Sequence, residues 1–158
     1  MTSPEKPDQP TDRPADPAAG ALFDAVAAEH GAIYGYGVVS AHSSPDENAL
    51  VAEAMAQHRT RREAAIALLT DANVGVPLPA VGYSMPIEVD TPGQAAQLAV
   101  DMEQDTATAW RAVVEQAADE KVRAFGVAAM LEAAVMAARW RVVAGQKPVT
   151  VAFPGGAE

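Results

Sequence analysis

The stretch ALFDAVAAEHGAIYGYGVVSAH, residues 21–42, decides the fold, because it is a helix with a carboxylate on its apolar face. The apolar positions that recur at helical spacing are Leu22, Val26, Ile33 and Tyr36 or Gly37. Glu29 falls within this stripe, on the side that faces the protein interior. Because an unpaired buried charge is very costly, we expect Glu29 to meet polar partners from other helices.

The composition indicates one α-helical domain. The 158 residues are 49% hydrophobic but only 5% aromatic, which favours closely packed helices over a sheet sandwich. The formal net charge of -10 argues against nucleic acid as a partner. The absence of cysteine excludes disulfides, thiolate chemistry and Cys-bound zinc. With no signal-peptide core and no apolar run of membrane-spanning length, we expect a cytoplasmic protein with no membrane partner.

The two ends of the chain differ from its middle. Residues 1–18 hold five prolines among charged and small residues, which predicts a disordered Pro-rich tail. Residues 147–158 follow the end of the last helix and alternate apolar with small residues. We expect this extended tail to pack on the bundle, or on a dimer mate, with Trp140 as its floor; the alternative is a docking peptide for another protein. The domain between them covers 19–146.

Four helices are predicted in this domain. They run over 18–41, from the cap Ser44 to 71, over 91–118, and from the cap Asp119 to 144. Residues 73–92 hold four prolines and two glycines and cannot be helical. So long a link is a crossover, which a bundle needs when its second and third helices run parallel. Tyr83 and Met85 are the residues expected to anchor it.

Each later helix also carries polar residues on its apolar stripe. The stripes place His58 and Arg62 on the second helix, Glu103 on the third, and Glu132 with Arg139 on the fourth. On the fourth helix, the remaining stripe positions are Phe125, Ala128, Val135 or Met136, and Val143. Four helices of this design would turn their polar residues toward one another.

The order and spacing of several short motifs resemble a small, alanine-rich, ferritin-like family of unknown function found in actinobacteria. The motifs are AEHGAIYGYG (28–37), HRTRRE (58–63), the 83–86 loop, ME (102–103), ARWR (138–141) and AFPG (152–155). The resemblance covers nearly everything after the proline tail. It implies an all-α, ferritin-like four-helix bundle with a long crossover between helices 2 and 3, and no particular activity.

The chain departs from dimetal ferritins, whose sites use one acid from each of two helices and a Glu-x-x-His motif from each of the other two. It contains no Glu-x-x-His. Glu29, His58, Glu103 and Glu132 could still bind one iron or manganese ion. A cation from Arg62 beside that site instead favours a metal-free network, in which Arg62 and Arg139 neutralise the buried carboxylates.

Three functions therefore compete. The favoured hypothesis is a non-catalytic structural or binding module, a homodimer with a degenerate centre and no cofactor. The alternative is a divergent metal-dependent oxidase or iron-handling protein that uses the four metal-ligating candidates. A third hypothesis is a small apolar ligand bound between the helices and the 73–92 link.

Overall fold

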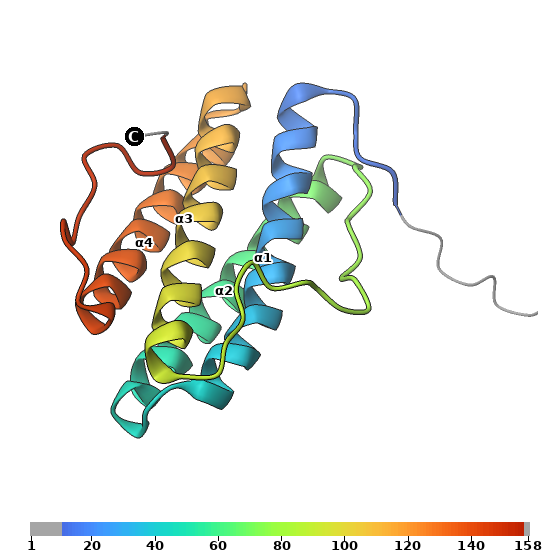
Figure 1. Cartoon of the computed structure of the whole chain (residues 1–158). Coiled ribbons are helices and arrows are strands. Elements are labelled where there is room, and N and C mark those ends of the chain that lie inside the picture. Colours follow the sequence, from blue (N-terminus) through green and yellow to red (C-terminus); the bar gives the residue numbers. More distant parts are fainter. Residues whose placement is uncertain (1–10, 157–158) are drawn as a thin grey trace, which may run out of the picture.

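The computed structural model describes residues 11–156 and contains four α-helices, with no strand in that range (Figure 1). They are α1 (Pro17–His42), α2 (Asn48–Asp71), α3 (Pro92–Gln116) and α4 (Glu120–Ala144). The prediction of an all-α four-helix bundle is confirmed. No helix in the described part of the chain is both long and apolar enough to cross a membrane.

Side-chain caps set three of the four helix starts. Asp16 accepts a hydrogen bond from the backbone N–H of Ala19, and Asp119 accepts one from Val122. Thr91 and Gln94 form a complete capping box at the start of α3. Gly145 ends α4 in the left-handed conformation, with φ of 68°, which glycine adopts without steric cost.

The prediction that Ser44 caps α2 is wrong. The Ser44 hydroxyl donates to the Glu47 carboxylate, and no backbone N–H of the helix reaches it. Pro45–Glu47 then form a separate 3-10 turn, so α2 begins only at Asn48.

The link between α2 and α3 runs back along α1, so that α3 points the same way as α2 (Figure 1). Its backbone is bound to α1 by His30, whose Nε2 donates to the carbonyl of Pro77 at 3.1 Å. The Tyr83 ring lies 5.3 Å from that of Tyr34, and Met85 packs against the core. As predicted, Tyr83 and Met85 lie against the bundle.

The helices contact one another in the order α2, α1, α3, α4, and α4 barely touches α2. The core divides into two apolar clusters, one around Tyr36 and Trp140 and the other around Leu22 and Trp110. Glu29, His58, Arg61 and Glu103 are also buried. The bundle therefore has a polar layer between two apolar ones.

The predicted inward face of α4 is wrong except at Met136. The buried positions are Gly126, Ala129, Ala133, Met136, Ala137, Trp140 and Arg141. Phe125 is half-buried, and Glu132, Val135, Arg139 and Val143 are exposed. Small residues lie inward because α4 approaches α3 closely: a Cβ on Gly126 would stand 3.1 Å from Val114.

The Pro-rich segment predicted for 1–18 lies outside the described residues over positions 1–10. Within the described part, Arg13 forms an ion pair with Asp24 of α1 at 2.8 Å. At the other end, the carbonyl of Val149 accepts a hydrogen bond from Arg141, and Gly155 lies against the backbone of α3 at Ala107.

The prediction that Trp140 forms the floor of the C-terminal segment is wrong, although Trp140 is the large apolar residue nearest to it in sequence. Its indole turns into the core, where the residue is fully buried and donates to the Tyr36 hydroxyl. Phe153, the largest apolar side chain of the segment, is 74% exposed. The segment instead lies along α3 and α4 with its glycines against α3.

Candidate functional site

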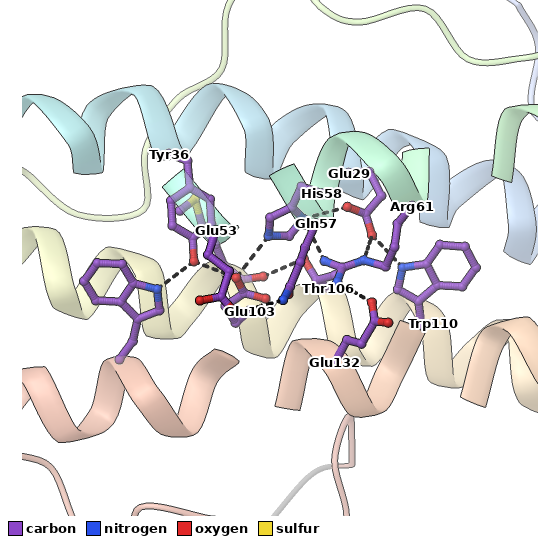
Figure 2. A network of polar contacts seen from close by, with 12 residues as sticks. Glu29, Tyr36, Glu53, Gln57, His58, Arg61, Glu103, Thr106, Trp110 and Glu132 are labelled. Atoms are coloured by element: carbon purple, nitrogen blue, oxygen red, sulfur yellow. Dashed lines mark hydrogen bonds and ion pairs between the residues drawn. The ribbon is translucent and has the colours of Figure 1, made fainter. Parts of the chain in front are cut away.

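A continuous chain of hydrogen-bonded side chains crosses the middle of the bundle (Figure 2). At one end the Trp140 indole donates to the Tyr36 hydroxyl at 2.8 Å, and Tyr36 donates to Glu103 Oε1 at 2.6 Å. At the other end the Trp110 indole donates to Glu29 Oε1 at 2.7 Å. His58 joins the two halves, with Nδ1 2.6 Å from Glu29 Oε2 and Nε2 3.0 Å from Glu103 Oε1.

Arg61 adds a second buried cation to this chain. Its Nε donates to Glu29 Oε1 at 2.9 Å, and its Nη1 donates to Glu132 Oε2 at 3.2 Å. The Arg61 residue is 4% exposed, whereas the Glu132 side chain is 52% exposed. Glu132 therefore closes the network at the surface, and all four helices contribute to it.

The network has an approximate two-fold repeat. Glu29 and Tyr36 stand seven residues apart on α1, and Glu103 and Trp110 stand seven apart on α3. Because α1 and α3 are antiparallel (Figure 1), each carboxylate accepts a hydrogen bond from the aromatic residue of the other helix. His58 lies between the two carboxylates and bonds to both.

His58 is an imidazolium in this setting. Burial alone would lower its pKa, but hydrogen bonds to Glu103 and Glu29, together with their charges, raise it from 6.5 to about 9. Both ring nitrogens then carry hydrogen and donate to carboxylates. Nη2 of Arg61 also lies 3.0 Å from Nδ1 of His58. With that Nδ1 hydrogen directed at Glu29, the approach is a contact between two cations that share one carboxylate.

The neighbouring groups keep the protonation states that this arrangement needs. Burial raises the pKa of Glu29, but the hydrogen bond and charge of His58, with the charge of Arg61, bring it below its ordinary value. Burial and the adjacent Glu103 hold the pKa of Tyr36 well above 10. Glu29 is therefore a carboxylate, and Tyr36 stays a phenol that donates.

The structure brings together Glu29, His58 and Glu103 from the predicted set. Glu132 joins them only through Arg61. Tyr36, Trp110 and Trp140 also belong to the network. The sequence prediction gives Tyr36 as a position of the apolar stripe and Trp140 as the floor of the C-terminal tail. The signal that could have found Tyr36 and Trp110 is the seven-residue spacing after a stripe carboxylate, since that spacing returns to the same helix face.

The placement of Arg62 and Arg139 in the network is wrong. Arg62 pairs with its neighbour Glu63 on the surface at 2.7 Å, because the buried face of α2 passes through Arg61 instead. Arg139 pairs with Glu53 of α2 at 2.7 Å, also on the surface, because α4 turns Trp140 inward.

As arranged, these residues do not fit a metal centre. Both nitrogens of His58 are bonded to carboxylates, which leaves no imidazole lone pair for a metal. The Arg61 guanidinium and the His58 imidazolium already share the Glu29 carboxylate, so a metal ion there would be repelled by two cations. Between residues 11 and 156, no three His, Asp or Glu side chains converge as metal ligands.

The chain is similar to a known protein family and to a solved structure. A family model described as a domain of unknown function (DUF4439) matches residues 21–158. The crystal structure of a conserved hypothetical protein, rv2844, from Mycobacterium tuberculosis is similar, with 52% sequence identity and a TM-score of 0.80. That match covers 87% of this chain and 96% of that chain. No curated protein matches the chain.

Replacing Arg61 and Arg62 separately tests which arginine belongs to the network. Arg61→Leu leaves Glu29 with one cation fewer, so we expect the free energy of unfolding to fall by about 3–5 kcal/mol. Arg62→Leu removes a surface pair and should cost at most about 1 kcal/mol. Urea denaturation followed by circular dichroism measures both. Equal losses would contradict the assignment of Arg61.

The pKa of His58 predicts a loss of stability at alkaline pH. Below pH 6.5 the ring is protonated in the folded and unfolded chains, and its stabilisation is complete. Between 6.5 and about 9 only the folded chain keeps the proton, so stability declines, by roughly 3 kcal/mol in all. Urea denaturation across this range should show the decline, and His58→Gln should remove it. If the stability of the variant declined with pH in the same way, His58 would not be the imidazolium that we assign.

Proposed function

We propose that this chain, which belongs to the DUF4439 family, is a non-catalytic, ferritin-like binding module without a resident metal. The observation that carries the proposal is the chemistry of the buried layer. An imidazolium and a guanidinium stand among the carboxylates where a dimetal protein of this fold would hold its ions. Neither iron nor manganese is expected as a cofactor.

The charges support this reading. Glu29, Glu103 and Glu132 supply three negative charges, and His58 and Arg61 supply two positive ones. Buried carboxylates need such partners, because desolvation otherwise makes their ionised form too costly. With fixed cations already in place, a metal ion would have to displace Arg61 and deprotonate His58. The alternative, a metal-dependent oxidase using Glu29, His58, Glu103 and Glu132, requires both changes.

Metal analysis separates the two functions. Protein purified from cells grown with ample iron and manganese should contain only substoichiometric metal, and added Fe²⁺ or Mn²⁺ should leave its melting temperature unchanged. His42→Ala is the matched control, because His42 lies at the end of α1, outside the network. Stoichiometric metal that is retained in His42→Ala and lost in His58→Ala would overturn the proposal.

We also propose that the module is a homodimer formed through the outer face of α4. Leu131, Val135 and Val142 are 50%, 61% and 64% exposed, and with Ala138 they repeat at intervals of three and four residues. That spacing is typical of a helix–helix seam. A row of apolar side chains on one helix is the kind of patch that a partner surface covers.

Charge supports a second copy as that partner. Glu132 and Arg139 flank the seam and are both about half exposed. In an antiparallel pair of α4 helices that opposes Leu131 with Val142 and Val135 with Ala138, Glu132 of each copy lies on the same edge of the seam as Arg139 of the other. The seam is therefore complementary to itself, as a two-fold interface requires.

A charge placed in the seam should break the dimer. The unaltered protein is expected to elute with twice the mass of one chain, measured by light scattering, and Val135→Glu with the mass of one. Val81→Glu adds the same charge to a fully exposed valine in the 72–91 link and should leave the dimer intact. A monomeric unaltered protein, or a dimeric Val135→Glu variant, would show that α4 is not the interface.

A further inference from the structure

A cavity of about 150 Å³ lies between α3, α4 and the C-terminal segment. Its walls include Glu103 and Ala107 of α3, Ala134 and Arg141 of α4, and Phe153 with Gly155 of the segment. Glu103 also belongs to the buried network, so the cavity adjoins that network. Ala107, Ala134 and Phe153 make much of its wall apolar.

One oxygen of Glu103 has no hydrogen-bond partner. Oε1 accepts from both Tyr36 and His58, whereas the buried Oε2 accepts from no group among the described residues. A buried acceptor left unsatisfied is costly, and most such atoms in proteins have a partner. The network also carries one net negative charge, from three carboxylates and two cations. A positively charged donor would satisfy both the oxygen and the charge.

Arg141 is a buried cation that lacks an anionic partner among the described residues. The residue is 6% exposed, and its Nη1 donates to the carbonyl of Val149 at 3.3 Å. Within residues 11–156, no carboxylate lies within ion-pairing distance of it. A guanidinium in this position is well suited to bind a carboxylate, with two parallel hydrogen bonds.

We propose that this cavity binds a small zwitterion of amino-acid size. Its carboxylate pairs with Arg141, and its ammonium group pairs with Glu103 when the buried Oε2 turns toward the cavity. A cavity of this volume holds a molecule about as large as benzene, so a glycine, alanine or β-alanine skeleton fits. The inference rests on the binding role proposed above, and it gives that role a ligand class.

The C-terminal segment forms one wall of the cavity. Gly155 has φ of 72°, and a Cβ there would stand 2.6 Å from the carbonyl oxygen of Ala107. Glycine therefore lets the segment lie directly on α3, while Phe153 and Pro154 line the cavity. A ligand beside the segment would be partly shielded from water, which strengthens both ion pairs.

Calorimetric titration of the metal-free protein tests the inference independently of the metal result. Glycine, L-alanine and β-alanine are the zwitterionic probes. Ethylamine carries only the ammonium group, and propionate carries only the carboxylate. At least one zwitterion should bind with one-to-one stoichiometry, and tighter than either half alone. No binding by any zwitterion at saturating concentration, or equal binding by ethylamine, would overturn the proposal.

Variants locate the binding site. Arg141→Gln and Ala134→Leu should weaken zwitterion binding roughly tenfold or more, the first by removing a charged donor and the second by filling the cavity. Arg123→Gln, on the same helix but away from the cavity, is the matched control. Circular dichroism checks that each variant is folded. Undiminished binding in Arg141→Gln and Ala134→Leu would exclude this cavity.

The chain's own terminal carboxylate is the competing occupant of Arg141. A chain that ends at residue 156 should bind the zwitterion as the full chain does. If truncation creates binding that the full chain lacks, the terminus holds the arginine and the proposal fails.

Discussion

The imidazolium of His58, bonded on one side to Glu29 and on the other to Glu103, is the interaction on which the rest of the structure depends. Three helices meet in that one ring, because Glu29 comes from α1, His58 from α2 and Glu103 from α3. Any shift of one helix along another would separate a buried charge from its partner. The desolvation cost of an unpaired ion makes such a shift unfavourable. The ion pairs therefore fix the register of helices whose alanine-rich faces would otherwise slide easily.

The aromatic residues at the two ends make this charged layer compatible with an apolar core. Trp110 and Trp140 each turn a single N–H toward the network and the rest of the indole toward a hydrophobic cluster. Tyr36 does the same with its hydroxyl. On each side of the charged layer, a single aromatic side chain therefore spans the change from polar to apolar surroundings. Trp110 shares Oε1 of Glu29 with Arg61, and Tyr36 shares Oε1 of Glu103 with His58.

Much of this arrangement could be predicted from the sequence, and the failures have a common cause. Glu29 and Glu103 stood out because a lone carboxylate within an apolar stripe has few explanations. On α2, Arg61 and Arg62 lie three and four residues after His58, and both spacings return to nearly the same face, so the pattern could not separate them. On α4, the inward face is built largely of alanine and glycine, and alanines occur all around that helix. Val135 and Val143 face outward although Met136 and Trp140 face inward, so hydrophobic bulk did not mark the inward face. The network itself could not be predicted, because it depends on how the four helices are rotated about their axes.

The near absence of contact between α2 and α4 has a further consequence for how this sequence can change. The groove between them is lined largely by small side chains, including Ala56, Thr60, Ala64 and Ala128, and Arg61 forms part of its floor. Elsewhere in the bundle an added methylene group would collide with a packed neighbour. Here it would enter open space beside the Arg61 guanidinium. The groove is thus a site where evolution or protein engineering can add bulk without repacking the interior.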